Sequence, residues 1–148
     1  EARAYCAWLA YHSGLPVRLP TEAEREVAVR GAAMRRYAYG EEAKRECANT
    51  AEAHIGSTTP IGVFPCGVTP EGVHDLSGNI WEWTSTLRRP YPYRADDGRE
   101  DAHTPDEHRV VRGGSWYHSA WQARGAYRGV PYRPYHANDN VGFRIVVG

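Results

Sequence analysis

Asp75 and Glu82 are the acidic residues whose placement points most directly to chemistry, because a strand-like segment lies between them. An extended strand would present the backbone carbonyls of Gly78 and Ile80 on one side, flanked by the two carboxylates. Such an oxygen-only set suits Ca²⁺, a hard cation that prefers carboxylate and carbonyl ligands. We therefore predict a calcium site at these four residues. The alternative is that Asp75 caps a turn and Glu82 pairs with an arginine such as Arg112.

The three cysteines, Cys6, Cys47 and Cys66, do not form a pattern typical of a metal site. Their number is odd and no two of them form a Cys-x-x-Cys pair, so a cysteine-rich zinc site is not indicated. Free cysteine packs as a small apolar residue, and we predict buried free thiols. A Cys47–Cys66 disulfide is the alternative.

The composition excludes two classes of partner. Lys plus Arg and Asp plus Glu both number 18, so the net charge is zero and no basic excess is present for general nucleic-acid binding. No apolar run approaches the roughly 20 residues of a membrane-spanning helix. No signal peptide is visible and the first residue is not Met. We therefore expect a fragment of a longer protein, and the sequence does not indicate its cellular compartment.

Two segments show helical patterns. Residues 1–13 should form a helix that ends at Gly14, a natural C-terminal stop. Its apolar stripe is wide, which predicts that the helix is largely buried. A second helix should begin at Thr21, which forms a capping box with Glu24, and end near Gly31.

The rest of the chain indicates short strands separated by many turns. Alternation predicts a strand over residues 80–84, and residues 61–64, 109–112 and 141–147 are also strand-like. Residues 87–108 mix charges with prolines and should form a solvated loop. The 15 glycines and 10 prolines agree with little regular structure.

Five motifs, in this order, resemble those of the formylglycine-generating-enzyme (sulfatase-modifying factor) family. They are Arg18-Leu19-Pro20-Thr21-Glu22-Ala23-Glu24, Cys47-Ala48-Asn49-Thr50, Gly72-Val73-His74-Asp75-Leu76-Ser77-Gly78-Asn79-Ile80-Trp81-Glu82-Trp83-Thr84, Arg109-Val110-Val111-Arg112-Gly113-Gly114-Ser115-Trp116 and Val141-Gly142-Phe143-Arg144. The resemblance implies an α+β, C-type-lectin-like fold with two helices, small twisted antiparallel sheets and many loops. Residues 1–148 would form a single such domain that lacks its N-terminal part. It also implies calcium at the positions of Asp75, Gly78, Ile80 and Glu82.

The family's oxidase chemistry lacks its ligands in this sequence. Formylglycine-generating enzymes oxidise a substrate cysteine with copper and dioxygen, and their two cysteines follow the Gly-Gly-Ser-aromatic motif. A thiolate pair suits Cu(I), but residues 117–128 contain no cysteine. A second branch makes sulfoxides with iron held by histidines of an additional helical domain, which is absent here. We therefore predict no catalytic residues and no copper or iron. The alternative is an oxidase or a regulatory pseudo-enzyme of this family.

Residues 117–140 combine tyrosines with hydrogen-bonding side chains at the place where the catalytic cysteines would lie. This composition is typical of antibody loops, in which Tyr gives rigid contacts at a low entropy cost. The arrangement resembles the variable proteins of diversity-generating retroelements, which implies binding of a protein or other macromolecular ligand. The predicted variable positions are Tyr117, His118, Ser119, Gly129, Val130, Tyr132, Arg133, Tyr135, His136, Asn138 and Asn140. Arg124 and Arg128 match scaffold arginines of the family and are interpreted as structural.

Overall fold

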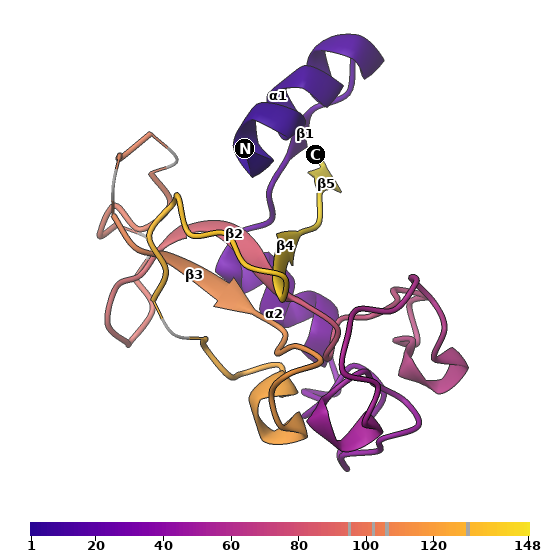
Figure 1. Ribbon diagram of the computed structural model, residues 1–148. Coiled ribbons are helices and arrows are strands. Elements are labelled where there is room, and N and C mark those ends of the chain that lie inside the picture. Colours follow the sequence, from indigo (N-terminus) through magenta and orange to yellow (C-terminus); the bar gives the residue numbers. More distant parts are fainter. Residues whose placement is uncertain (95, 102, 106, 130) are drawn as a thin grey trace.

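The computed structural model describes residues 1–148 except 95, 102, 106 and 130. Within these residues the chain forms two α-helices, five short strands and three 3₁₀ turns, joined by long irregular segments (Figure 1). The helices and strands are α1 (Ala2–Ser13), β1 (Val17–Arg18), α2 (Glu22–Arg30), β2 (Trp81–Leu87), β3 (Arg109–Arg112), β4 (Val141–Phe143) and β5 (Val146–Val147). The 3₁₀ turns are η1 (Ala51–Ala53), η2 (Pro65–Gly67) and η3 (Ala120–Ala123).

Two small sheets organise the fold. The larger has the order β3-β2-β4, and α2 packs against β2 and β3. The smaller pairs β1 with β5 antiparallel, which brings the two ends of the chain close together (Figure 1). The prediction of antiparallel sheets is confirmed for β1 with β5 and for β2 with β3, whereas β4 runs parallel to β2. The Asn140 carbonyl, just before β4, accepts from the amide of Trp81, the first residue of β2, so the two strands start side by side.

The predicted capping box begins α2. The Thr21 hydroxyl accepts from the Glu24 amide at 3.1 Å, and the Glu24 carboxylate accepts from the Thr21 amide at 2.8 Å. Hydrogen bonds from Arg18 to the same carboxylate lower the pKa of Glu24 to about 2. The helix ends at Gly31, as its sequence predicts.

Helix α1 has the predicted bounds but not the predicted burial. It ends at Gly14 in the left-handed conformation, and Cys6 is its only buried residue among those described. Cys6 packs on Val17 and Leu19, whereas the wide stripe continues around the helix to Trp8, which is 54% exposed. The helix projects from the body of the molecule (Figure 1), so only one edge of its stripe meets another element.

Two predicted strands differ from the structure. Residues 61–64 form a turn rather than a strand, because Gly62 has a positive φ of 79° and its amide donates to the Asp75 carboxylate. Residues 141–147 divide into β4 and β5 around Arg144, whose side chain turns inward to Glu82. The strands predicted at 80–84 and 109–112 are confirmed as β2 and β3.

Cys47 and Cys66 form a disulfide, which confirms the alternative and corrects the expectation of free thiols at these two positions. The bridge joins the chain just before η1 to η2, with a sequence separation of 19. Cys6 remains a free thiol, and burial raises its pKa. This segment has little regular structure, and its conformational freedom in the unfolded chain is what the bridge reduces.

Candidate functional site

The Gly-Gly-Ser turn after β3 directs the chain into the region predicted to vary. Gly113 and Gly114 have φ values of 107° and 73°, which L side chains rarely adopt. A Cβ at Gly114 would lie 2.9 Å from the Cα of Ala123, so the turn also packs tightly against η3. Both features confirm the structural role that the sequence assigns to the two glycines.

The residues of the predicted calcium site lie in one region, but Glu82 is engaged elsewhere. Its buried carboxylate accepts from Arg25 Nε at 2.6 Å and from Arg144 Nη2 at 2.6 Å. Burial alone would raise the pKa of Glu82, but the two guanidinium groups outweigh burial and hold it below its usual value. The alternative of an arginine partner is thus realised, with Arg25 and Arg144 in place of Arg112.

The Asp75 carboxylate has fewer hydrogen-bond partners than the Glu82 carboxylate. Its Oδ2 accepts from the Gly62 amide at 2.8 Å, and its backbone has a positive φ of 54°. A calcium ion bound at Asp75 and Glu82 would compete with the guanidinium groups of Arg25 and Arg144 for the Glu82 carboxylate. Across the described part of the chain, no three side chains from His, Cys, Asp and Glu gather into a group that could hold a metal. Calcium binding stays a prediction.

A calcium titration checks that prediction. If Asp75 ligates the ion, the melting temperature in CaCl₂ should be higher than in EDTA. Binding should raise the free energy of unfolding by about 2.7 kcal/mol when the calcium concentration is 100 times its Kd. Asp75→Asn should remove the difference, and Asp101→Asn, in the loop between β2 and β3, should leave it unchanged. Equal melting temperatures in CaCl₂ and EDTA for the wild type would contradict the site.

His118 lies in a small polar cluster beneath the loop. Its Nδ1 is 2.7 Å from the Ser115 hydroxyl, and the Trp81 indole donates to the same nitrogen at 3.2 Å. Desolvation lowers the pKa of His118 and favours the neutral ring that accepts these bonds. Asn140, which is 7% exposed, points its amide toward the Ser115 hydroxyl at 3.5 Å. The cluster packs beneath the loop, and sequence patterns give no sign of it because Trp81 and Asn140 are far in the chain from Ser115 and His118.

Gly129, another predicted variable position, does not reach the surface. Gly129 is buried, and a Cβ there would lie 2.7 Å from Val111 Cγ2 and 3.0 Å from Trp81 Cζ3. Val130 lies outside the described residues.

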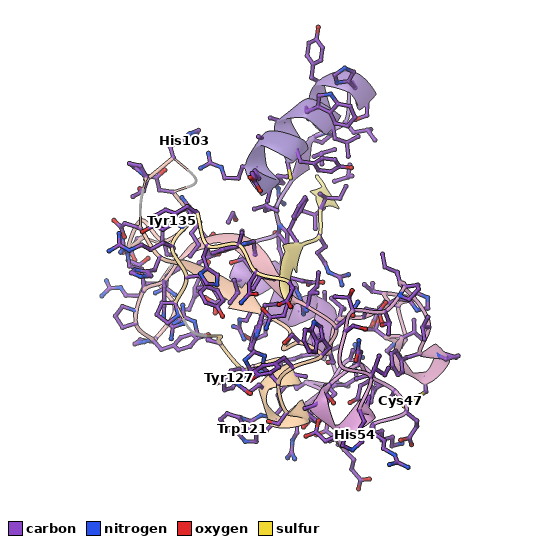
Figure 2. All side chains as sticks on the ribbon, viewed as in Figure 1. Cys47, His54, His103, Trp121, Tyr127 and Tyr135 are labelled. Atoms are coloured by element: carbon purple, nitrogen blue, oxygen red, sulfur yellow. A yellow bond between two sulfur atoms is a disulfide. The ribbon has the colours of Figure 1, made fainter. Side chains whose placement is uncertain are left out.

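The exposed predicted positions form two separate groups. The first precedes η3 and contains Tyr117, which is 68% exposed, and Ser119. The second contains Arg133, Tyr135 and Asn138, and Tyr135 is 72% exposed. Figure 2 shows Tyr135 well separated from Trp121, which follows the first group in η3.

Tyr132 and His136 support the second group. Their rings stack with centroids 4.0 Å apart, and Tyr132 also packs edge-on against Trp83 at 6.0 Å. The Tyr132 carbonyl accepts from the Arg109 amide at 3.1 Å, which ties this segment to β3. The side chains of Tyr132 and His136 are half-buried, and the exposed Tyr135 lies between them in the chain.

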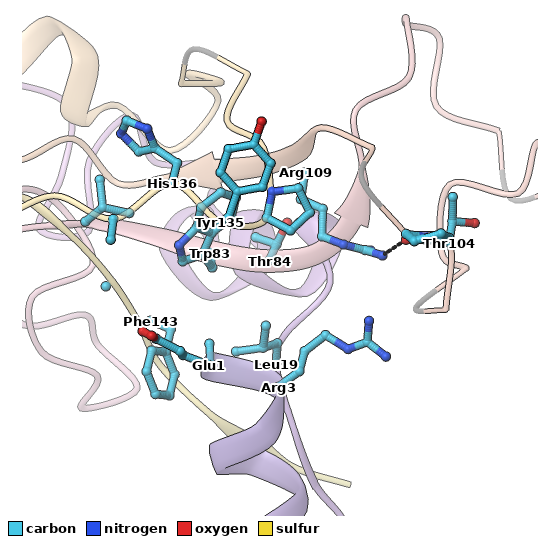
Figure 3. A pocket seen from close by; sticks show the side chains of 16 residues that line it. Glu1, Arg3, Leu19, Trp83, Thr84, Thr104, Arg109, Tyr135, His136 and Phe143 are labelled. Carbon is cyan, nitrogen blue, oxygen red and sulfur yellow. Dashed lines mark hydrogen bonds between the residues drawn. The ribbon is translucent and has the colours of Figure 1, made fainter.

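A cleft of about 730 Å³ adjoins this second group. Tyr135, His136 and Trp83 line one side, and Arg3 of α1 and Phe143 lie on the opposite side (Figure 3). Aromatic walls with a few charged groups at the rim are typical of ligand sites. The cleft therefore provides a concave surface next to residues that the sequence predicts to vary.

The comparisons with known proteins place this geometry among related domains. The chain is 32% identical to hercynine oxygenase of Mycobacterium tuberculosis, over 98% of this chain and 34% of that protein. It is 33% identical to the inactive C-alpha-formylglycine-generating enzyme 2 of Bos taurus, over 100% of this chain and 48% of that protein. The chain thus spans between a third and a half of these relatives, which include both an enzyme and an inactive member.

Two solved structures share the fold. PvdO from Pseudomonas aeruginosa superposes with a TM-score of 0.81 at 26% identity, over 99% of this chain and 58% of that one. Variable protein 1 of Treponema denticola superposes with a TM-score of 0.74 at 27% identity, over 87% and 46%. Together with the two helices and small mixed sheets, these likenesses confirm the C-type-lectin-like α+β fold.

Neither α1 nor α2, the α-helices that the described residues contain, is long and apolar enough to cross a bilayer. Four of the five motifs fold here into the Gly-Gly-Ser turn, the capped α2 and the paired strands, and the fifth contains Cys47 of the disulfide. The model of the sulfatase-modifying factor enzyme 1-like domain matches the whole of residues 1–148, and the chain belongs to this family.

Proposed function

We propose that this chain is a non-catalytic ligand-binding domain whose C-terminal surface is varied by a diversity-generating retroelement to recognise a macromolecular ligand. The observation that supports it best is the exposure of five predicted positions, next to His118, Tyr132 and His136, which are half-buried. The exposed positions are Tyr117, Ser119, Arg133, Tyr135 and Asn138. The likeness to a variable protein agrees with this proposal.

The arrangement of thiols supports the non-catalytic part of the proposal. The family's copper chemistry needs a thiolate pair, and soft Cu(I) selects such ligands. Here Cys47 and Cys66 are bonded to each other, and Cys6 is buried in α1 against Val17. The segment after Ser115 contains no cysteine and supplies His118, whose Nδ1 is already hydrogen-bonded.

The chemistry of the exposed positions supports the ligand-binding part. Tyrosine and arginine dominate the energetics of many protein interfaces, because they bury large areas and form hydrogen bonds at the same time. Tyr117 and Tyr135 each offer such a side chain, and Arg133 adds a charge. Ser119 and Asn138 add adaptable hydrogen-bonding groups.

Sequencing of the locus tests the proposal. A reverse transcriptase gene and a near-copy of the 3′ end, differing only at adenines, should lie beside the coding sequence. Sibling isolates should then differ at Tyr117, Ser119, Arg133, Tyr135 and Asn138 and agree elsewhere. Even scatter of substitutions along the chain, or a locus without a template repeat, would contradict diversification.

Tyr135→Ala should abolish ligand binding with no more than a small change in melting temperature, because the side chain is 72% exposed. Tyr132→Ala should weaken binding and also lower the melting temperature, because its ring packs on Trp83 and His136. Pull-down from an extract of the source cells, compared by quantitative mass spectrometry, reports binding, and thermal melting reports stability. A large stability loss in Tyr135→Ala would place that side chain in the core instead.

A further inference from the structure

A second groove, of about 570 Å³, lies between the C-terminal end of α2 and the segment that follows η3. We call it the arginine groove, because five of its ten lining residues are arginines and Glu41 is its one acidic lining residue in the described structure. The arginines are Arg30, Arg35, Arg36, Arg124 and Arg128. The chain as a whole has no net charge, so this local excess of positive charge is a product of the fold.

Backbone contacts hold the two walls of the groove together. The Gly125 amide donates to the Arg36 carbonyl at 2.8 Å. Beneath them, the buried Arg112 donates to the carbonyls of Gly125 and Tyr127 at 2.8 and 3.2 Å. A Cβ at Gly125 would lie 2.8 Å from side-chain atoms of Val29 and Arg30, so the walls are also in close contact. The groove is therefore preformed, which lowers the entropic cost of binding.

Three of the arginines already have carboxylate partners. Arg30 pairs with Glu26, Arg35 with Glu71 and Arg128 with Glu22, at 2.7 to 3.0 Å. These pairs fix the guanidinium groups and leave part of their hydrogen-bonding capacity for another anion, since each guanidinium has five N–H donors.

Arg36 and Arg124 differ from the other three. Neither forms an ion pair with a carboxylate within the described residues. The guanidinium of Arg124 lies over the Trp121 ring, 4.0 Å from its centroid, and its Nε donates to the Trp121 carbonyl. Arg124 is thus oriented by a neutral partner while its charge remains without a counterion in the structure.

We propose that the arginine groove binds an acidic segment of a protein partner, with its Asp or Glu carboxylates facing Arg36 and Arg124. The planar guanidinium fork matches a carboxylate in a bidentate arrangement. A groove of this volume accommodates several residues of an extended peptide, well beyond one isolated small anion. The lining arginines are outside the predicted variable positions, so the inference does not depend on diversification.

The aromatic rings of the groove argue against single-stranded nucleic acid. Such ligands stack their bases on free aromatic faces. Arg128 already lies over the Tyr91 ring, 4.7 Å from its centroid. Tyr127 packs against Trp121 at 4.8 Å and Trp81 at 6.0 Å. These contacts occupy part of the ring surface that stacked bases would need, and Tyr91, 55% exposed, is the ring with free surface that remains, which favours carboxylates over bases.

Fluorescence anisotropy with a fluorescein-labelled octaglutamate peptide tests the inference. Wild type should bind the peptide at low salt, and binding should weaken as salt rises. Arg36→Gln with Arg124→Gln should raise Kd by about tenfold or more, the effect of losing a charge-assisted contact. Glu41→Gln, which removes the acidic lining residue, should lower Kd. Arg45→Gln is the matched control, because Arg45 is exposed and does not line the groove.

Competition experiments separate the alternatives. Pyrophosphate that displaces the peptide at an equal or lower concentration would show a small-anion site and overturn the proposal. Tighter binding of labelled octathymidylate than of octaglutamate would overturn it in favour of nucleic acid. Equal weakening by Arg45→Gln and by the double substitution would also overturn it, since the binding would then be nonspecific. Thermal melting confirms that each variant is folded, so a loss of binding reports on the groove.

Discussion

Glu82→Gln should lower the free energy of unfolding by about 3–5 kcal/mol, the typical result of removing one partner from a buried ion pair. The Glu82 carboxylate accepts from both Arg25 and Arg144, and Arg25 is 2% exposed. The amide keeps the shape of the carboxylate but not its charge, which leaves a buried guanidinium without a counterion. Chemical denaturation of the wild type and the variant measures the difference.

Glu24→Gln is the control for this substitution. Glu24 also pairs with an arginine, but both side chains are more than 40% exposed, so its ion pair contributes about 1 kcal/mol or less. Equal losses in Glu82→Gln and Glu24→Gln would contradict a buried ion-pair core.

The same residue predicts a dependence of stability on pH. The pKa of Glu82 is lower in the folded protein than the value of about 4.3 of an unperturbed Glu. Its contribution is therefore fully present above that value and is lost as the pH falls toward the folded pKa. Wild type should lose more stability than Glu82→Gln between neutral pH and pH 3. Parallel curves for the two proteins would contradict the assignment.

Gly129→Asn should destabilise the protein by about 3 kcal/mol or more, because it combines overpacking with a buried polar group. A Cβ at this position would meet Val111 and Trp81 at 2.7 and 3.0 Å. The backbone of Gly129 is also held by hydrogen bonds, because its amide donates to the Val111 carbonyl and its carbonyl accepts from Arg88. Denaturation midpoints measure the loss.

Ser119→Asn makes a matched control within the same region. Ser119 is exposed and makes no side-chain capping hydrogen bond to η3, so its replacement should change stability by no more than about 0.5 kcal/mol. If diversification occurs, natural variants should differ at Ser119 and retain Gly129. A stable Gly129→Asn protein would return position 129 to the set of candidate recognition residues.

Local patterns predicted much of the fold. The capping box of Thr21 and Glu24 lies within one helical turn, and Gly14 and Gly31 end their helices for conformational reasons that neighbouring residues do not alter. Alternation likewise predicted β2, and the strand-like residues 109–112 form β3. The two glycines after Arg112 predicted the tight turn, because positive φ is a local property.

Burial was the feature that local patterns predicted least well. The stripe of α1 looks the same in the sequence whether its aromatic face is covered or not, and Trp8 is 54% exposed. Within residues 117–140, Gly129 and Tyr135 both looked suitable for ligand contact, yet one is buried and the other is 72% exposed. Solvent exposure depends on which distant segments pack against a residue, and spacing along the chain does not report that.

The amino-acid sequence therefore suffices for the family, the capped helix, the main strands and the absence of a cysteine pair after Ser115, since each depends on residues that are close in the chain. The tertiary structure alone decides the partners of Glu82, the Cys47–Cys66 bridge and the arginine groove. In each of these, the groups come from separate segments of the chain, and spacing along the sequence does not report which segments folding brings within a few ångströms of one another.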